Sequence, residues 1–343
     1  MRLFVDIEKK LGSFHLRTKL EVESEKLALL GASGCGKSMT RKCIAGIEKP
    51  DKGKIILDGV MLFDSEKHID LPPQKRQVGY LFQQYALFPN MTAEQNIRCA
   101  LPKKMTREEK KQALSDLVRR FRLEGLEKKL PAQLSGGQQQ RIALARILAS
   151  RPKAILLDEP FSALDSFLKW DLEAELSELL ADFPGPIVWV SHDLGECRRN
   201  CERVCVMENG TSGKQMGLVD LIRHPDSVSA ARLAGHKNFL PAVKAEGGCA
   251  EIPAWGLTLS KVPLENHEAT VCIPQSALDF SGSTYTWRVR RAIADVDHEI
   301  VLLAPDNAPQ DVPMLRAELP LQNAPKAGDT LSFSVAEDEI LVY

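Results

Sequence analysis

The stretch KLALLGASGCGKS, residues Lys26–Ser38, decides the fold of the first part of this 343-residue chain. Its second half fits the pattern G-x-x-x-x-G-K-S, with Gly31, Gly36, Lys37 and Ser38 at the specified positions. The apolar run KLALL predicts a strand before the loop, and MTRKCIAGI predicts a helix after it. Strand, glycine-rich loop and helix in this order are typical of a phosphate-binding loop in an α/β protein.

The chemistry of this loop follows from its backbone. Glycines let successive N–H groups curl around phosphate oxygens, and the N-terminus of the next helix adds the positive end of its dipole. We expect Lys37 to neutralise the β- and γ-phosphates of a nucleotide and Ser38 to bind Mg²⁺. The predicted nucleotide-binding residues of the loop are Gly31, Ala32, Ser33, Gly34, Cys35, Gly36, Lys37, Ser38 and Met39.

Polar side chains follow three further apolar runs. In ILLDEP the apolar run is followed by Asp158 and Glu159. A parallel sheet would present these carboxylates at its carboxyl edge, where such sheets bind ligands. We expect Asp158 to hold Mg²⁺ and Glu159 to deprotonate the attacking water. His192 follows GPIVWV and can donate to a γ-phosphate, although a structural role also fits it. Gln83, after VGYLF, can bind Mg²⁺ or orient water, and its alternative is an ordinary surface amide.

A second anion-docking point is predicted at LSGGQQQRIALARIL, from Leu134 to Leu148. There Ser-Gly-Gly opens an amphipathic helix, and a helix N-terminus attracts anions. The sequence therefore carries two anion-docking loops but one set of catalytic carboxylates.

These motifs, in this order and spacing, resemble those of ABC transporter ATPase subunits over about the first 235 residues. The resemblance relates Gly31–Ser38 to Walker A, Gln83 to the Q-loop, Leu134–Gln138 to the signature, Ile155–Glu159 to Walker B, Ser162–Asp165 to the D-loop and His192 to the switch histidine. It implies that two subunits pair head to tail and sandwich each ATP, with Mg²⁺, between one Walker A and the partner's signature. It assigns Ser135, Gly136, Gly137, Gln138 and Asp165 to ATP binding.

The adenine platform is the least specific of the implied features. Members of the family stack the base on an aromatic residue near the N-terminus, and in KKLGSFHLRTKL that residue is Phe14. The usual tyrosine or tryptophan is missing, so a core phenylalanine is the alternative.

The predicted architecture is an α/β P-loop cassette followed by a small all-β domain. We expect the cassette over 1–235, with a charged, leucine-periodic helical subdomain inserted at about 89–140. After that, short runs such as ATVCIP and EIVLLA alternate with Gly, Pro, Asn and Asp, which predicts strands over 236–343. This region resembles the OB-like regulatory domain of importer ATPases. Its basic residues Arg288, Arg290, Arg291 and Lys326 could bind an oxyanion.

The tract QQYALFPNMT after Gln83 is apolar where a solvated turn is expected. It resembles the importer tract that receives a coupling helix, which implies contact with transmembrane permease subunits through Tyr85–Pro89. The other interpretation buries these side chains under the helical insert. The resemblance further implies a homodimer at the cytoplasmic face of the cell membrane, served indirectly by a periplasmic or extracellular solute-binding protein.

The solute is less defined by these residues. The layout fits importers of molybdate, sulfate, ferric iron or polyamines, and the N-terminal KKLGSFHL most resembles the molybdate/tungstate group. Non-transport ABC ATPases acting in translation or DNA repair carry tandem cassettes or long coiled-coil inserts, which this sequence does not show.

Composition bounds the remaining functions. Lys+Arg 45 and Asp+Glu 46 leave a net charge of -1, so no global charge favours nucleic acid or an anionic membrane, and no nucleic-acid partner is expected. Asp6 and Glu8 argue against a signal peptide, and the longest apolar runs fall short of the about 18 residues of a spanning helix. Eight cysteines form no C-x-x-C pair, and Cys197, Cys201 and Cys205 are expected to be buried thiols.

Overall fold

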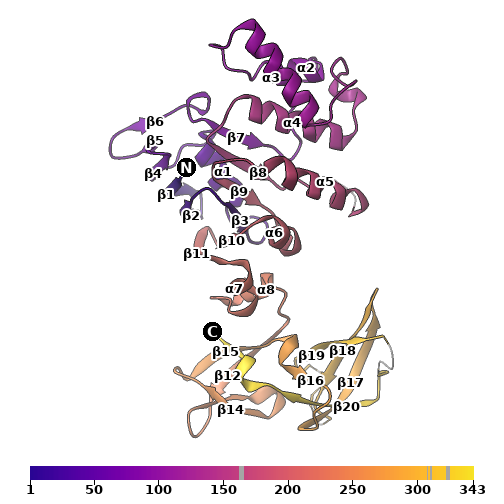
Figure 1. Ribbon diagram of the computed structural model, residues 1–343. Coiled ribbons are helices and arrows are strands. Elements are labelled where there is room, and N and C mark those ends of the chain that lie inside the picture. Colours follow the sequence, from indigo (N-terminus) through magenta and orange to yellow (C-terminus); the bar gives the residue numbers. More distant parts are fainter. Residues whose placement is uncertain (162–165, 307, 310, 322–324) are drawn as a thin grey trace. The chain divides into compact units, whose positions relative to one another are not determined.

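The computed structural model describes residues 1–343 except 162–165, 307, 310 and 322–324 (Figure 1). It divides into two compact units, Met1–Val219 and Asp220–Tyr343. The composition of the sequence predicts a boundary between 235 and 236. The two short helices α7 (Leu218–Arg223) and α8 (Val228–Leu233) lie between the two positions, and the strands of the second unit begin after them.

The first unit is built on an 11-stranded mixed sheet. In order across the sheet, its strands are β6 (Ile69–Asp70), β5 (Val60–Asp64), β4 (Lys52–Leu57), β1 (Leu3–Leu11), β2 (Phe14–Val22), β11 (Thr211–Gly217), β10 (Arg203–Glu208), β3 (Lys26–Leu30), β9 (Ile187–Val190), β8 (Ala154–Asp158) and β7 (Val78–Leu81). The strands from β10 to β7 run parallel to one another. This parallel half carries the predicted motifs at its carboxyl edge.

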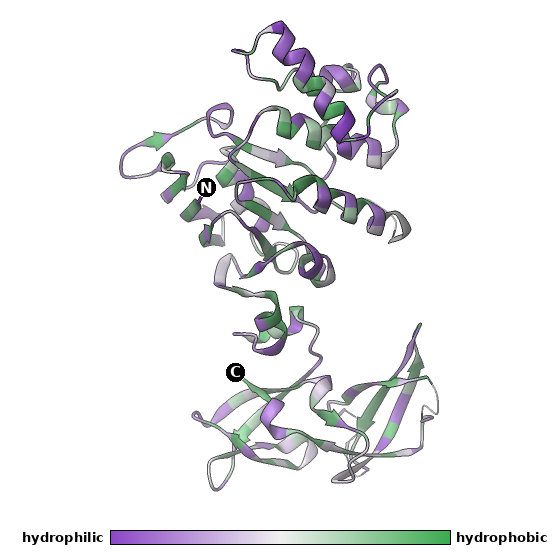
Figure 2. Cartoon of the chain, in the orientation of Figure 1, coloured by the Kyte–Doolittle hydropathy of each residue, from purple (hydrophilic) through white to green (hydrophobic). Residues whose placement is uncertain are grey.

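The two halves of this sheet differ in their sequence pattern for a physical reason. Helices cover both faces of a parallel sheet, so its strands read as continuous apolar runs. Strand β9 is buried at every position, and β3 and β8 are buried at all but one end residue. In the antiparallel half, β1 instead alternates at its start, where Leu3, Val5 and Ile7 are buried. Figure 2 shows the resulting hydrophobic strands of this unit.

Six helices and two 3₁₀ turns accompany the sheet in the described part of the first unit, before α7. They are α1 (Lys37–Ala45), α2 (Ala93–Arg98), α3 (Arg107–Arg120), α4 (Gly136–Ala149), α5 (Ser166–Leu180) and α6 (Leu194–Asn200), with η1 (Pro73–Lys75) and η2 (Pro131–Gln133). Helices α2 and α3 and the beginning of α4 lie within 89–140, where the sequence predicts an inserted helical subdomain, and α4 continues to Ala149. Each begins with a capping box, in which a Thr or Ser and a Gln or Glu three residues later satisfy each other's backbone N–H groups.

After α8, the regular elements of the second unit are strands and short 3₁₀ turns, as the sequence predicts for this region. One five-stranded antiparallel sheet contains β14 (Leu257–Pro263), β13 (Cys249–Ile252), β12 (Asn238–Lys244), β15 (Glu268–Ile273) and β21 (Leu341–Val342). The other contains β16 (Leu278–Asp279), β20 (Thr330–Val335), β17 (Tyr285–Ala294), β18 (His298–Ala304) and β19 (Leu315–Pro320). The 3₁₀ turns η4 (Gln275–Ala277) and η5 (Glu337–Glu339) lie between strands of different sheets, and η3 (Pro253–Trp255) lies between β13 and β14.

Both sheets of the second unit contribute to one hydrophobic core. Trp287 lies at its centre, with ring centroids 5.0 Å from Trp255 and 5.1 Å from Phe333, in edge-to-face contacts. Aromatic rings prefer this geometry over a face-to-face sandwich. Together with the first unit, this confirms the predicted order of an α/β body with inserted helices followed by an all-β region.

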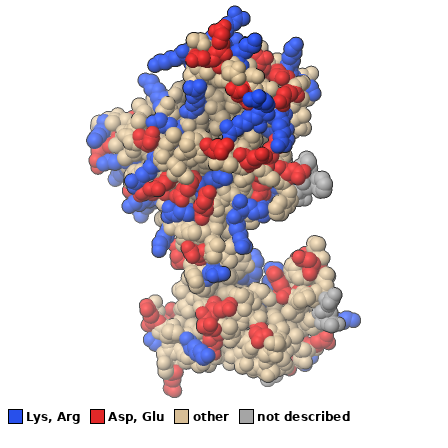
Figure 3. All heavy atoms as spheres, viewed as in Figure 1, with Lys and Arg blue, Asp and Glu red and all other residues tan. Residues whose placement is uncertain are grey.

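The surface charges agree with the balanced composition. On the face drawn in Figure 3, Lys and Arg are interspersed with Asp and Glu. Within the described residues, no helix is both long enough and apolar enough to cross a membrane.

Candidate nucleotide-binding site

The predicted site residues of the first unit gather where neighbouring parallel strands end. In the sheet, Leu81 lies opposite Leu157, and Asp158 lies opposite Val190. Since Gln83, Glu159 and His192 each follow these paired positions by one or two residues, all three lie at the same edge. The glycine-rich loop leaves β3, which pairs with β9, at this edge as well. The structure therefore brings four sequence motifs together.

The glycine-rich loop wraps around its own lysine. Lys37 is 7% exposed, and its Nζ donates to the carbonyl of Gly31 at 2.6 Å and to that of Ala32 at 2.9 Å. Gly36, with φ 113°, precedes α1, and a Cβ there would lie 2.6 Å from Leu16 Cδ1. Only glycine combines this backbone with this close approach. In this arrangement the Lys37 ammonium group donates to two carbonyls of the loop that is predicted to bind phosphate.

Phe14 lies next to the same loop. It is half-buried against the core of the first unit, and its Cζ would be 3.3 Å from a Cβ at Gly36. The structure thus puts an aromatic edge beside the phosphate-binding loop, where an adenine platform is expected. The packing against the core also satisfies the alternative interpretation of this residue.

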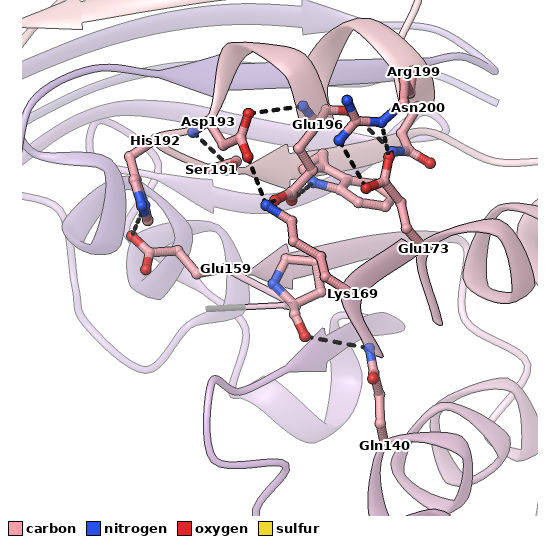
Figure 4. Close-up of polar contacts among 12 residues, drawn as sticks. Gln140, Glu159, Lys169, Glu173, Ser191, His192, Asp193, Glu196, Arg199 and Asn200 are labelled. Atoms are coloured by element: carbon pink, nitrogen blue, oxygen red, sulfur yellow. Dashed lines mark hydrogen bonds and ion pairs between the residues drawn. The ribbon is translucent and has the colours of Figure 1, made fainter. Parts of the chain in front are cut away.

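Glu159 and His192 face each other across the ends of β8 and β9, as Figure 4 shows. His192 Nδ1 is 3.7 Å from Glu159 Oε1, and the two side chains are 66% and 27% exposed. Glu159 has a φ of 43°, and its N–H donates to the carbonyl of Val190 at 3.0 Å. A non-glycine residue in the left-handed region is uncommon and is often found at functional sites. This geometry points the carboxylate toward the histidine and toward solvent.

A network of hydrogen bonds joins the histidine loop, Ser191–Asp193, to helices α5 and α6 (Figure 4). Asp193 caps α6 by accepting from the N–H of Glu196 at 3.0 Å, and it also accepts from Lys169 Nζ of α5 at 2.6 Å. Trp189 Nε1 donates to Glu196 at 2.7 Å. Burial raises the pKa of the Glu196 carboxyl. Burial also disfavours the charged form of Lys169, but its hydrogen bond to Asp193 and the nearby carboxylates outweigh this effect and raise the pKa of the lysine. The network holds His192 at a fixed strand end.

A second clamp joins the same two helices. Glu173 of α5 accepts from Arg199 Nε at 2.7 Å and Nη2 at 2.9 Å, and from Asn200 at 2.6 Å. The bidentate geometry is the strong form of an ion pair, and Glu173 is buried. Helices α5 and α6 are thereby joined as one support for the histidine loop.

The predicted Mg²⁺ ligands Ser38 and Asp158 lie close together, with an arginine between them. Arg41 Nη2 donates to Ser38 Oγ at 2.8 Å, and Arg41 Nη1 forms an ion pair with Asp158 Oδ1. Tyr80 donates its hydroxyl to Asp158 Oδ2 at 3.3 Å. Hydroxyl, carboxylate and amide oxygens are the donors that Mg²⁺ prefers, so the set formed with Gln83 fits the ion in kind. Gln83 is exposed, two residues past β7.

The signature residues lie at the start of α4, where Ser135 and Gln138 form its capping box. Ser135 and Gly136 are exposed, and Ser135 Oγ accepts from the N–H of Gln138 at 3.4 Å. A Cβ on Gly137 would approach Leu172 of α5 to 3.1 Å. Across the residues that the structure describes, no hydrogen bond or ion pair joins Ser135–Gln138 to Gly31–Ser38. The predicted ATP ligand Asp165 lies outside the described residues.

One contact connects this helix to the acidic strand end. Gln140 Nε2 donates to the carbonyl of Pro160, directly after Glu159, at 3.3 Å (Figure 4). Gln140 is 2% exposed. The N-terminal half of α4 is therefore linked to the loop that carries the proposed general base.

The tract after Gln83 divides into a buried and an exposed part. Tyr85 is 7% exposed, whereas Phe88 is 47% exposed. Arg146 of α4 donates to the carbonyls of Tyr85 and Ala86 at 3.1 and 2.9 Å, and its guanidinium lies 5.3 Å from the Phe88 ring centroid. Tyr85 and Ala86 have φ values of 58° and 46°. Leu87 is intermediate and Pro89 is exposed. Burial of Tyr85 agrees with the alternative interpretation of this tract, and contact of its exposed residues with a permease stays a prediction.

Two of the four basic candidates in the second unit, Arg288 and Arg290, contact the segment that follows β18. Arg288 pairs with Asp306 at 2.7 Å, and Arg290 donates to the carbonyl of Pro305 at 3.1 Å, so both hold the chain that follows β18. Cys197, Cys201 and Cys205 are buried, as predicted, and burial raises the pKa of the Cys197 thiol to about 12. Over the described part of the chain, no group of three or more His, Cys, Asp or Glu residues could hold a metal ion.

Sequence reasoning missed Arg41, Arg146 and the Lys169 network. The available signal for Arg41 was its position, three residues after Ser38 and on the same face of α1 as the buried Ile44. A charge on an otherwise buried helix face requires a partner. For Arg146 and Lys169 the partners are loop carbonyls and distant carboxylates, which no local pattern reveals.

A phosphate-binding loop, an acidic strand end and a histidine at one edge of a parallel sheet define a P-loop nucleotide-binding cassette. Residues 17–162 match the family described as ABC transporter. The chain belongs to the ABC transporter family.

Several known proteins support this assignment. The chain is 40% identical over 240 residues to the sulfate/thiosulfate import ATP-binding protein CysA of Synechocystis sp., covering 69% of this chain and 66% of the relative. It is 36% identical over 223 residues to the molybdenum import ATP-binding protein ModC of Paramagnetospirillum magneticum (65% and 61%). It is 34% identical over 297 residues to the Fe(3+) ions import ATP-binding protein FbpC of Brucella abortus (82% of each). The matches thus span about two thirds or less of the first two relatives' own length.

A solved structure agrees with the fold. The ATP-binding cassette MJ0796, in a dimeric post-hydrolysis state bound to ADP and Pi, superposes with a TM-score of 0.53 at 29% identity. The match covers 64% of this chain and 99% of that one.

Proposed function

We propose that this chain is the ATP-hydrolysing subunit of an ABC importer. The observation that carries the proposal is the pairing of Glu159 with His192 at the strand edge that also holds the Lys37 loop. The N–H groups of the loop and of α1 bind the phosphates, and Lys37 leaves the Gly31 and Ala32 carbonyls for the β- and γ-phosphates. Phe14 stacks on the adenine.

In the proposed reaction, Glu159 takes the proton of the attacking water. His192 lies beside it, so it can hold the γ-phosphate by a hydrogen bond while the carboxylate orients the water. Gln83 adds an amide at the same edge. Mg²⁺, when bound, neutralises phosphate charge, and its proposed ligands are Ser38, Asp158 and Gln83.

The signature would complete the site of a second copy. Ser135 and Gly136 are exposed at the N-terminus of α4, and within the described residues no hydrogen bond or ion pair joins them to their own phosphate loop. A helix of this length offers N–H groups and a dipole to an anion. We therefore propose a homodimer in which Ser135, Gly136, Gly137 and Gln138 of one chain bind the ATP held by Lys37 of the other, with Asp165 at the same interface.

The mixed-chain experiment tests this arrangement. Lys37→Ala and Ser135→Arg should each abolish turnover alone, because each removes one side of both sites. Mixing the two variants should restore activity, since a mixed dimer has one intact site and one doubly impaired site. Random pairing gives mixed dimers in about half of the population, so we expect about a quarter of the wild-type turnover. A mixture that forms mixed dimers but remains inactive would contradict composite sites.

Transport coupling would use the exposed part of the tract after Gln83. Phe88 and Pro89 are exposed, and Arg146 holds the backbone beneath them. We propose that Tyr85–Pro89 receives a helix of a transmembrane permease, which places the chain at the cytoplasmic face of the membrane. A periplasmic or extracellular solute-binding protein would act through that permease.

For the solute we propose an oxyanion, with molybdate or tungstate first, because the N-terminal KKLGSFHL resembles that group. Relatives named for sulfate/thiosulfate, Fe(3+) and spermidine/putrescine have similar identity, so those solutes are the alternatives. The test is ATPase activity of the chain reconstituted with a permease and binding protein, titrated with molybdate, sulfate, ferric iron and spermidine. Stimulation by loaded molybdate-binding protein would support this choice. Stimulation by another solute would support the importer function but contradict molybdate as the solute. No response to any of the four solutes would favour a non-transport ATPase.

A further inference from the structure

Arg41 is a buried cation within the proposed metal site. It belongs to α1, three residues after Ser38, and is 1% exposed. Its guanidinium contacts three groups: Nη1 pairs with Asp158, Nη2 donates to Ser38 Oγ at 2.8 Å, and Nε donates to the carbonyl of Lys37 at 3.3 Å. A buried charge is retained only where such partners compensate it.

Two of these partners are the groups expected to bind the metal. Both oxygens of Asp158 are engaged, Oδ1 by Arg41 and Oδ2 by the Tyr80 hydroxyl at 3.3 Å. The Tyr80 ring also lies under the guanidinium, with its centroid 6.0 Å from Arg41 Cζ. Arg41 therefore sits between a hydroxyl and a carboxylate, with an aromatic ring beside it.

A guanidinium and a divalent cation compete for these oxygens. Mg²⁺ requires oxygen ligands at about 2.0–2.1 Å in near-octahedral geometry. Two positive charges held a few ångströms apart in a site of low dielectric repel strongly. Direct binding of the metal by Ser38 and Asp158 therefore favours an arrangement in which the guanidinium has left them.

The geometry points to Arg41 as an internal cation that competes with Mg²⁺ for Ser38 and Asp158. In the observed arrangement, Arg41 neutralises Asp158 and holds the N-terminal part of α1 to the end of β8. When metal and nucleotide bind, the guanidinium moves away, and the cost of that movement lowers the metal affinity of the site. This inference rests on the proposed Mg·ATP function of the same site.

The test compares Arg41→Leu with Lys42→Leu. Leucine at position 41 removes the charge and keeps apolar bulk in the core, whereas Lys42 is the exposed neighbour, so Lys42→Leu removes an equal charge outside the site. Mn²⁺ binding is followed by electron paramagnetic resonance in the presence of a non-hydrolysable ATP analogue, with Mg²⁺ as competitor. Binding of the analogue without metal is measured separately in EDTA by fluorescence.

We expect Arg41→Leu to bind Mn²⁺ at least about tenfold more tightly than wild type, because one buried positive charge beside the metal is gone. Lys42→Leu should match wild type. Affinity for the analogue in EDTA should not rise in parallel, which separates competition at the metal site from a general change of the nucleotide pocket. In addition, Mn²⁺ without nucleotide should raise the melting temperature of Arg41→Leu and leave that of wild type unchanged.

Equal or weaker Mn²⁺ binding by a folded Arg41→Leu chain would overturn the inference, because Arg41 would then be neutral toward the metal or support it. If Arg41→Leu does not fold, Arg41→Gln provides the test. Glutamine removes the charge but keeps an amide that can donate a hydrogen bond, so this variant should also bind Mn²⁺ more tightly than wild type. Unchanged binding in that variant would also overturn the inference. Failure of wild type to bind the analogue at all would instead contradict the proposed function.

Discussion

His192 Nδ1 lies 3.7 Å from Glu159 Oε1, although the two residues end different strands of the sheet. The distance is slightly longer than a hydrogen bond, and such contacts often tighten only when substrate is bound. Both side chains reach solvent, so the pair is open to a nucleotide. Its position beside the phosphate loop makes it the most informative pair to change.

Glu159→Gln should bind ATP and form dimers yet hydrolyse ATP about 10²–10⁴-fold more slowly, the usual contribution of a general base. The amide preserves size and cannot accept the proton. Turnover and nucleotide affinity are measured on the same preparation. Glu178→Gln, whose side chain is 73% exposed on α5, is the matched control and should leave turnover unchanged. Near-normal turnover of Glu159→Gln would refute the assignment of the base.

Replacement of a tyrosine by phenylalanine should change the free energy of unfolding in opposite directions at Tyr85 and Tyr80 of the first unit. Among the described residues the Tyr85 hydroxyl is buried without a hydrogen-bond partner, whereas the Tyr80 hydroxyl donates to Asp158. Tyr85→Phe removes an unsatisfied group and should raise the free energy of unfolding by about 1 kcal/mol. Tyr80→Phe loses a charge-assisted hydrogen bond and should lower it by about 1–2 kcal/mol. Urea unfolding of both variants measures the difference, and a loss of stability in Tyr85→Phe would show that its hydroxyl has a partner.

Arg146→Ala should loosen the tract that follows Gln83. The carbonyls of Tyr85 and Ala86 lose their donor, and the Phe88 ring loses the guanidinium beneath it. We expect faster amide exchange over 84–91 and weaker stimulation by a permease, with ATP binding retained. Arg119→Ala, at a side chain 79% exposed on α3, controls for loss of a surface charge. Exchange over 84–91 that stays as slow as in wild type would rule out this role for Arg146.

Cysteine alkylation at neutral pH should be selective. Thiolates are the reactive species, and burial raises the pKa of Cys43, Cys197 and Cys272 to about 12, so these thiols stay protonated. Cys99 is exposed and should react first, with the partly exposed Cys249 next. Mass spectrometry of the native chain after brief iodoacetamide treatment measures the order. Early modification of Cys197 would mean that the α6 region opens readily.

Local sequence patterns predicted most of the fold. The alternation of apolar runs and helical segments defined the α/β body, and the short runs after it predicted the all-β region. The capped starts of the inserted helices and the buried parallel strands follow from interactions within a few residues, which a pattern can represent. The division of the tract at Tyr85 and Phe88 was not predictable, because exposure depends on the Arg146 side chain sixty residues away in sequence.

By itself, the sequence determined that this protein has a phosphate-binding loop, an acidic strand end and a second anion-docking helix, since each is a motif of adjacent residues. Only the tertiary structure decided which of these groups meet. The pairing of Glu159 with His192 depends on the order and register of β7, β8 and β9. The ion pair of Arg41 with Asp158 depends on how α1 packs against the end of β8. Long-range pairing is set by the packing of the whole sheet, and for that reason the cation within the proposed metal site became visible only in the folded chain.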